Sequence, residues 1–200
     1  PGGEPAMDLS LRLWRHPRPE GAEGLCLGRT DLPVDPRRAR RLAHRIRQWS
    51  RIEAGPREVW TSPLQRCRAV GECLSSWGWR HHIDDRLREL DFGDWDGRAW
   101  GQIRVESIDA WCADLRFHRP GGGESLDELA QRCAGFLAEC GARPRYVVTH
   151  GGWMTTAWHL AQGRPLPATA ALWPAAPGYG QALDLAQRAT GTGVLGEKSQ

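Results

Sequence analysis

Lysine is almost absent from this 200-residue chain: Lys198 is the only lysine, and arginine supplies the other fixed positive charges. Because such a bias affects the whole chain, it says little about any single arginine, and each arginine has to be judged by its position. The formal net charge is only +3. This excess is too small to favour nucleic acid or an anionic membrane as a partner.

The sequence also lacks closely spaced cysteine pairs, a secretory segment and long apolar runs. None of the six cysteines has the CxxC spacing that is typical of zinc sites and redox motifs. No hydrophobic leader segment stands at the start, and no apolar run is long enough to span a membrane. We therefore expect free thiols in a reducing environment and a cytoplasmic location.

The length and composition favour one domain with a substantial core. The first letters, PGGEPA before Met7, are typical of an unstructured extension. We expect a disordered segment over 1–9, a single domain over 10–190 and a flexible tail over 191–200.

Strand patterns and helix patterns alternate along the chain. We expect strands over 10–16, 57–61, 80–84, 145–150 and 180–187, and helices over 36–49, from 63 onward, 105–117, from 126 onward and 153–163. A loop rich in Gly, Asp and Trp is expected over 88–104. Two helix starts have specific signals: Ser62 is a good N-cap with Pro63 at the first helical position, and Ser125 with Glu128 has the spacing of a capping box.

This alternation predicts an α/β protein, with a mostly parallel central sheet in a three-layer α/β/α arrangement. In such sheets ligands bind beyond the carboxyl ends of the strands. The candidate strand ends are residues 15–16, 61–62 and 149–150, and two of them carry a histidine.

These two histidines, His16 and His150, are suited to phosphoryl transfer if they converge. A neutral imidazole is a competent nucleophile and can carry a phosphoryl group. Guanidinium groups match the charge and geometry of the phosphoryl oxygens, and they would come from Arg15, next to His16, and from Arg66 in the following helix. A carboxylic acid such as Glu89 would give the leaving alkoxide its proton.

Each of these residues also has an ordinary interpretation. A histidine at a strand end is commonly a packing or surface residue, and Arg66 or Glu89 alone is typical of a solvated surface. Asp91, Asp94 and Asp96 are close enough to suggest a calcium loop, but the EF-hand pattern with its terminal Glu is missing. We expect neither a metal nor a cofactor.

Five segments together resemble the histidine phosphatase superfamily, which includes cofactor-dependent phosphoglycerate mutase and α-ribazole phosphatase. The resemblance covers about residues 10 to 188. It is carried, in order, by RH after the first strand, TSPLQRCRA, LRELDFGDWDG, GGGES and VVTHGG. Their order and spacing are far more specific than any one segment, and they imply a phosphoglycerate mutase-like fold.

The resemblance also implies a role for each candidate residue. His16 would be the phosphorylated nucleophile, and Arg15 and Arg66 would bind the phosphate. His150 would contact the phosphate oxygens and stabilise their charge. Glu89 would be the proton donor to the leaving group and then the base for the attacking water.

The chain departs from the family pattern after His16. Residues 17–19 replace the usual G-E-T, and Ala22 stands where the family usually has an asparagine that contacts substrate or phosphate. Arg18 or Arg29 is a candidate replacement for that contact. The segment CLGRTDLPVD most resembles the α-ribazole phosphatase branch, which often reads C-x-G-R-x-D there.

These features predict a metal-independent phosphomonoesterase for a small phosphorylated metabolite, with α-ribazole 5′-phosphate in cobalamin synthesis as the candidate substrate. The sequence between Glu89 and His150 is short for the substrate cap of a glycolytic mutase, so we favour hydrolysis over mutase transfer. A catalytically quiet phosphoester-binding regulator on the same fold is the alternative from another class. The sequence leaves open whether the protein is a monomer or a homodimer.

Overall fold

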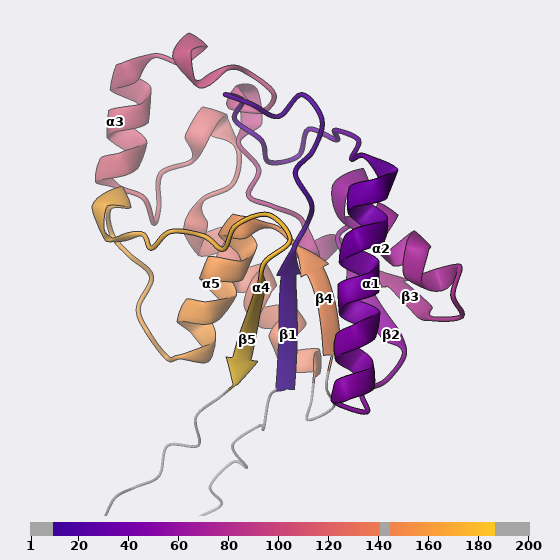
Figure 1. Ribbon diagram of the computed structural model, residues 1–200. Helices are drawn as coiled ribbons and strands as arrows, with labels where there is room; N and C mark the ends of the chain where they lie inside the picture. Colours follow the sequence, from indigo (N-terminus) through magenta and orange to yellow (C-terminus); the bar gives the residue numbers. More distant parts are fainter. Residues whose placement is uncertain (1–9, 141–144, 187–200) are drawn as a thin grey trace, which may run out of the picture.

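The computed structural model describes residues 10–140 and 145–186 (Figure 1). The extension predicted over 1–9 and the tail predicted over 191–200 lie outside the described residues. The strands are β1 (Ser10–Arg15), β2 (Glu58–Thr61), β3 (Arg80–Ile83), β4 (Arg145–Thr149) and β5 (Ala182–Ala186). The α-helices are α1 (Pro36–Ile52), α2 (Gln65–Ser75), α3 (Val105–Ala113), α4 (Leu126–Cys140) and α5 (Gly151–Ala161).

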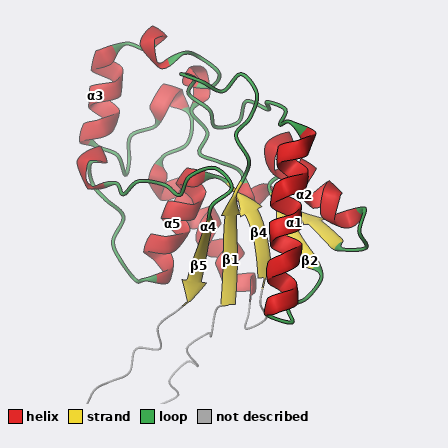
Figure 2. Cartoon of the chain, viewed as in Figure 1, coloured by secondary structure: helices red, strands yellow, loops and turns green. Residues whose placement is uncertain are grey.

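Within the described residues the strands form one sheet in the order β3-β2-β4-β1-β5. Strands β1 to β4 are parallel, and β5 pairs with β1 in the opposite direction (Figures 1 and 2). The register places Arg15 opposite Thr149 and Thr61 opposite Val148. The carboxyl ends of β1, β2 and β4 therefore lie side by side, which confirms the predicted mostly parallel sheet.

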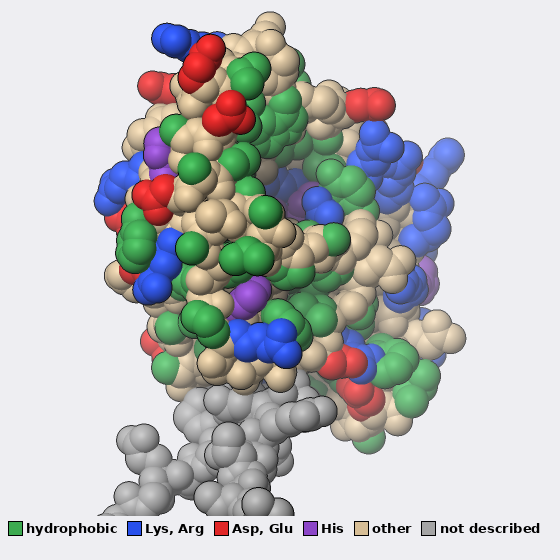
Figure 3. All heavy atoms as spheres, turned by 90° about the vertical axis from the view of Figure 1, so that its left-hand side faces the viewer, with side chains coloured by type: hydrophobic (Ala, Val, Ile, Leu, Met, Phe, Trp, Pro, Cys, Tyr) green, Lys and Arg blue, Asp and Glu red, His purple; other side chains and the backbone are tan. Residues whose placement is uncertain are grey.

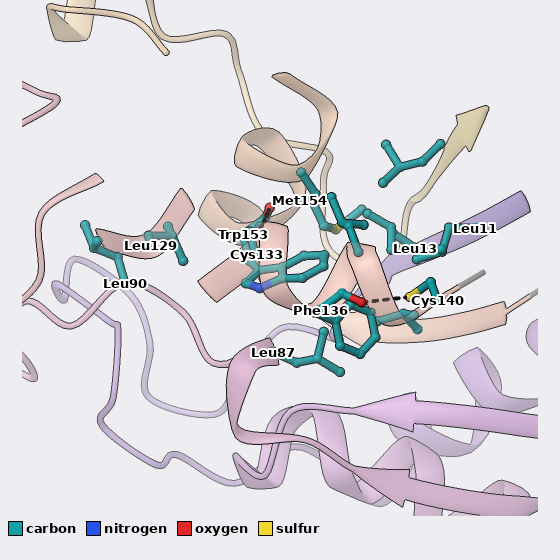
Figure 4. Packing of buried hydrophobic residues seen from close by; sticks show 14 of the residues in the cluster. Leu11, Leu13, Leu87, Leu90, Leu129, Cys133, Phe136, Cys140, Trp153 and Met154 are labelled. Atoms are coloured by element: carbon teal, nitrogen blue, oxygen red, sulfur yellow. Dashed lines mark hydrogen bonds between the residues drawn. The ribbon is translucent and has the colours of Figure 1, made fainter. Parts of the chain in front are cut away.

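The alternation of side chains along the strands divides the core into two layers. Trp14 and Val148 belong to a buried cluster with Ile46 of α1, which covers one face of the sheet together with α2. Leu13 belongs to a second cluster with Phe136 of α4, which covers the other face together with α5 (Figure 4). This is the three-layer arrangement that the alternating pattern predicts.

Two helices begin where local signals place them. The Asp35 side chain accepts the N–H of Arg37 at 2.8 Å, and Pro36 is the first residue of α1. At α4 the Ser125 hydroxyl accepts the N–H of Glu128 at 3.2 Å, while the Glu128 carboxylate accepts the N–H of Ser125 at 2.9 Å. The predicted capping box is therefore confirmed.

The predicted N-cap of α2 at Ser62 is wrong, because the helix begins at Gln65. The Ser62 hydroxyl accepts the N–H of Leu64 at 3.3 Å, before the helix begins, and lies 2.9 Å from a ring nitrogen of His150. The first N–H of the helix, from Gln65, donates to the Asp31 carboxylate at 2.7 Å.

The helix predicted over 105–117 is shorter, since α3 ends at Ala113. The chain turns inward so that the Leu115 side chain is buried and its N–H donates to the Ala168 carbonyl at 2.9 Å. The predicted loop over 88–104 contains two short 3₁₀ turns, η2 (Gly93–Trp95) and η3 (Trp100–Gln102). We call residues 98–117 the cap, because they lie beyond the carboxyl ends of the strands (Figure 1).

No helix in the part of the chain that the structure describes is both long and apolar enough to cross a membrane.

Candidate active site

Two buried histidine rings meet beyond the carboxyl ends of β1 and β4. The ring centroids of His16 and His150 are 5.1 Å apart, with an angle of 61° between the ring planes. The backbone N–H of His16 donates to the Thr149 carbonyl at 3.0 Å, which continues the β1–β4 pairing by one residue. The strand register therefore brings together the two histidines that the sequence singles out.

The neighbours of His16 select one tautomer of its ring. Its Nδ1 lies 2.7 Å from the Pro17 carbonyl oxygen, and because a carbonyl oxygen only accepts, Nδ1 carries the proton and Nε2 keeps a free lone pair. Burial, followed by the charges of Arg66 and Arg15, lowers the pKa of His16 well below 6.5. The ring is therefore neutral at pH 7, with Nε2 available as a nucleophile.

His150 has the opposite tautomer. Arg66 Nε donates to His150 Nδ1 at 3.3 Å, so the ring proton lies on Nε2, which donates to the Ser62 hydroxyl at 2.9 Å. Burial, followed by the charges of Arg66 and His16, lowers the pKa of His150 well below 6.5. Both ring nitrogens of His150 are engaged, which leaves His16 as the better nucleophile.

Arg66 is a buried cation between the two histidines and a loop after β1. Its Nη1 donates to the Thr30 carbonyl at 2.7 Å, and its Nη2 donates to the Gly28 carbonyl at 2.6 Å. Each terminal nitrogen carries a second N–H. Arg66 is therefore held by the protein while it still has donors for an anion.

Arg15 lies between the site and a segment that the sequence analysis did not single out. Its Nη1 donates to the Pro177 carbonyl at 2.8 Å, and its guanidinium carbon lies 4.2 Å from the centre of the Tyr179 ring. The Arg15 Nε is buried and has no hydrogen-bond partner among the described residues. The Tyr179 ring is also near His16, with 5.5 Å between the centroids. Arg15 therefore keeps one N–H donor that the described residues do not use.

Glu89 is held at the start of α5. Its carboxylate accepts the N–H of Gly152 at 2.9 Å and the N–H of Trp153 at 3.1 Å, in the place where the helix dipole favours negative charge. A Cβ on residue 152 would lie 2.6 Å from a Glu89 carboxylate oxygen, so glycine is required for this approach. The contact with Glu89 thus gives a steric reason for a glycine at position 152.

Arg132 of α4 fixes the backbone that carries Glu89. Its guanidinium donates to the carbonyls of Arg86 and Arg88 at 2.7 Å and to the Glu89 carbonyl at 2.9 Å. It also pairs with the Glu124 carboxylate at 2.7 Å. No sequence signal distinguishes Arg132 from the many other arginines on helices.

Asp96 holds the loop that positions Arg66. Its carboxylate accepts the backbone N–H groups of Gly28, Arg29 and Thr30 at 3.3, 2.6 and 2.8 Å. Burial opposes its ionisation, but the hydrogen bonds from Thr30 and from the loop backbone prevail and lower the pKa of Asp96. In this structure the Asp96 carboxylate therefore acts as an anchor for backbone donors.

A chamber of about 260 Å³ opens next to these residues, bounded on the reacting side by Arg15, Glu89 and Gly152. Figure 3 shows a hollow in this side of the molecule, with arginine and histidine side chains visible in it. The remaining lining is apolar or aromatic and consists of Ala22, Leu25, Leu27, Leu90, Phe92, Trp100, Trp111, Leu115, Leu126, Leu129, Trp173 and Tyr179.

The two weaker sequence candidates lie outside the chamber lining. Arg18 is half exposed and pairs with Glu23 at 3.4 Å, and Arg29 lies 3.7 Å from Glu124. Neither lines the chamber, whereas Ala22 does. Among residues 10–140 and 145–186, no group of three or more His, Cys, Asp and Glu side chains is arranged to hold a metal ion.

Comparison with known sequences gives a consistent family. Residues 11–176 match the family model of the histidine phosphatase superfamily (branch 1). The chain is 31% identical over 134 residues to phosphoglycerate mutase-like protein 4 of Arabidopsis thaliana, which covers 62% of this chain and 56% of that protein. It is 32% identical over 154 residues to a probable phosphoglycerate mutase of Klebsiella pneumoniae, which covers 72% of this chain and 70% of that protein. The chain thus spans little more than half the length of the Arabidopsis relative.

Solved structures have the same fold. The mycobacterial glucosyl-3-phosphoglycerate phosphatase superposes with a TM-score of 0.72 at 26% identity, over 86% of this chain and 87% of that chain. The α-ribazole phosphatase of Shigella flexneri superposes with a TM-score of 0.72 at 24% identity, over 87% and 88% of the two chains. The second likeness concerns the fold alone.

Proposed function

Because this chain belongs to branch 1 of the histidine phosphatase superfamily, we propose that it hydrolyses phosphate monoesters through a phosphohistidine on His16. The observation that carries the proposal is the hydrogen bond from His16 Nδ1 to the Pro17 carbonyl at 2.7 Å. It leaves Nε2 free in a neutral, buried ring beside Arg15 and Arg66, the two cations that would bind the phosphoryl oxygens.

The reaction takes two steps in this proposal. In the first, Nε2 of His16 attacks phosphorus, the bond from phosphorus to the ester oxygen breaks, and Glu89 gives a proton to that oxygen. In the second, water attacks the phosphohistidine, Glu89 takes a proton from the water, and the phosphorus–nitrogen bond breaks. The products are the alcohol and inorganic phosphate, and Glu89 returns to its starting protonation state.

The charge on the transferred group is met by fixed donors. Arg15 and Arg66 each have a guanidinium N–H that the described residues do not use. Preorganised donors of this kind stabilise a transition state without reorganisation during the reaction. The proposed mechanism therefore uses no metal, and full turnover in EDTA is part of its test.

For the natural substrate, α-ribazole 5′-phosphate is the candidate that the CLGRTDLPVD segment suggests. In this structure the segment makes structural hydrogen bonds. Asp31 accepts an N–H of α2, and the backbone N–H groups of Gly28 and Arg29 donate to Asp96. Leu27 of the segment and Leu25, just before it, line the chamber. The apolar lining is compatible with the aromatic base of such a substrate.

Phosphoryl transfer of the mutase type is the second candidate, because two of the relatives carry mutase names. A panel of phosphorylated metabolites that includes α-ribazole 5′-phosphate and 3-phosphoglycerate separates the two: hydrolysis releases inorganic phosphate, whereas a mutase returns an isomer.

The test of the proposal is His16→Ala, with exposed His44→Ala as the matched control. The variant should lose more than nine tenths of kcat on p-nitrophenyl phosphate, a barrier increase above ~1.4 kcal/mol, and should stay folded. Labelled substrate should leave an acid-labile, base-stable adduct on His16 of the wild-type protein. A phosphoserine adduct, or a fully active His16→Ala variant, would overturn the assignment.

A further inference from the structure

The chamber beside the phosphate site has charge only at its reacting end. Of the fifteen residues that line it, Arg15 and Glu89 alone are charged. Arg15 is directed to the phosphoryl group and Glu89 to the leaving oxygen in the proposed reaction, so no cation remains for a second anionic group. A carboxylate in this chamber would lose its hydration without an opposite charge or enough donors to replace it.

The cap supplies an aromatic wall to the chamber. The rings of Trp100 and Trp111 are nearly parallel, with centroids 6.4 Å apart and 11° between their planes. Phe92 stands almost perpendicular to both, at 6.1 Å from Trp100 and 5.7 Å from Trp111. Flat rings in parallel and edge-to-face contact make a wall that another flat apolar group can join.

The segment that follows α5 also lines the chamber. Trp173 lines the chamber and stacks on the ring of His159, with 14° between the planes and 6.0 Å between the centroids. Tyr179 lies over Arg15. A volume of about 260 Å³ is near the lower end of the usual range for small-molecule pockets, about 300–1,000 Å³. The chamber therefore suits the alcohol part of one small ester.

We propose that this chamber binds the leaving alcohol, and that the substrate class is a phosphate monoester of a neutral, largely apolar alcohol with a flat ring. The proposal rests on the proposed function, because it places the ester oxygen at Glu89. It argues against phosphoglycerate-type substrates, whose carboxylate would have no cation in the chamber.

Phosphonates test the chamber without any turnover, because their carbon–phosphorus bond is not hydrolysed. The probes are 3-phenylpropylphosphonate, propylphosphonate and 3-phosphonopropanoate, measured by isothermal titration calorimetry. We expect the phenyl compound to bind about 10- to 100-fold more tightly than the propyl compound, as burial of one ring predicts. The carboxylate compound should bind more weakly than the propyl compound.

A variant of the wall locates the effect. Trp111→Ala should reduce the phenyl-to-propyl affinity ratio at least several-fold, whereas Trp77→Ala, a tryptophan at the end of α2 outside the chamber, should leave the ratio unchanged. Equal affinity for the phenyl and propyl compounds, tighter binding of the carboxylate compound, or a ratio unaffected by Trp111→Ala would each overturn the proposal.

Turnover of the matched esters distinguishes this proposal from the proposed function. The leaving alcohols of 3-phenylpropyl phosphate and propyl phosphate have similar acidity, so their kcat/KM ratio should follow the ratio of phosphonate affinities. Tight, ring-dependent phosphonate binding without turnover of either ester would leave the chamber assignment standing and would contradict the hydrolase. Turnover of both esters at equal kcat/KM would support the hydrolase and would contradict the chamber assignment.

Discussion

The two histidines of the site differ in which ring nitrogen holds the proton, and their neighbours cause the difference. The Pro17 carbonyl can only accept, so it places the proton of His16 on Nδ1. Arg66 can only donate, so it places the proton of His150 on Nε2. Adjacent, buried imidazoles are thereby given unequal tasks: one has a free lone pair and the other has none.

The depressed pKa values of these histidines predict a dependence of stability on pH. Both rings are neutral in the folded protein because burial, and then Arg66, lowers their pKa below 6.5. Unfolding returns them toward the usual value, so the unfolded chain binds more protons below pH 6.5 and the free energy of unfolding falls as pH falls. Each ring contributes at most about 1.4 kcal/mol per pH unit in this range.

His150→Asn should therefore make the decline in the free energy of unfolding between pH 6.5 and 5.5 shallower by up to ~1.4 kcal/mol. Urea unfolding at fixed pH measures it, and the change of slope is independent of any overall loss of stability. The matched control is His44→Asn, because His44 is exposed. An unchanged slope in His150→Asn would contradict a neutral, buried ring.

Glu89 carries a kinetic prediction that separates proton transfer from a structural role. The need for a proton donor decreases as the leaving group becomes more acidic. Glu89→Gln should slow the phosphorylation step of an alkyl phosphate by about 10²–10⁴-fold and that of p-nitrophenyl phosphate far less. Dephosphorylation should slow for both, so the aryl substrate should give a burst followed by a slow steady rate.

Stopped-flow measurement on both substrates checks this prediction. If Glu89 only holds the start of α5, its loss should slow the two substrates equally and give no burst. That outcome would transfer the proton-donor role to a neighbour such as Asp91, and Asp91→Asn should then produce the burst instead.

At the scale of elements, a helix start was predictable where its signals are local. Ser125 and Glu128 satisfy each other within one turn of α4, so their spacing in the sequence was sufficient. Ser62 lies too far before Gln65 to cap α2, and its hydroxyl is shared between the N–H of Leu64 and the ring of His150, a residue far away in the sequence. The prediction of the end of α3 was wrong because of another contact between residues distant in the sequence: the inward turn at Leu115 depends on the Ala168 carbonyl.

The strands were easier to predict than the helix ends, because burial on a parallel sheet leaves a continuous apolar pattern. Strand β4 lies between β1 and β2 and is buried along nearly its whole length. The edge position of β3 agrees with its exposed and half-buried side chains. No pattern in the sequence indicated the strand order. The rule that ligands bind where parallel strands end indicated only which strand ends carry the site.

At the scale of the whole molecule, sequence reasoning reached the residues at strand ends and missed those that arrive from elsewhere. His16 and His150 were predictable because adjacent parallel strands deliver them to one edge. Glu89 was a candidate only because the leaving alkoxide needs a proton donor, and the resemblance to a family then gave it that role, since its own surroundings in the sequence are those of a loop. Tyr179 and Arg132 were missed because no local pattern indicates that their segments return to the site.

The site is held by one chain of hydrogen bonds that crosses the molecule. Asp96, next to the cap, binds the backbone of residues 28–30 after β1. That loop binds Arg66 of α2, and Arg66 binds His150 after β4. Segments distant in the sequence thus determine the position of the Arg66 guanidinium. A substitution at Asp96 should therefore lower the catalytic rate, although Asp96 does not line the chamber.

Asp96→Ala should lower kcat/KM by about 10- to 100-fold, because displacement of a positioned group by about 1 Å has costs of this order. Asp94→Ala, an exposed carboxylate two residues earlier, is the matched control and should stay near wild type. The double variant with Arg66→Ala provides the sharper measurement. If Asp96 acts through Arg66, the double variant should be hardly worse than Arg66→Ala alone, whereas independent roles would make the two losses add in free energy. Additive losses would show that the loop between them does not transmit the position of Asp96 to Arg66.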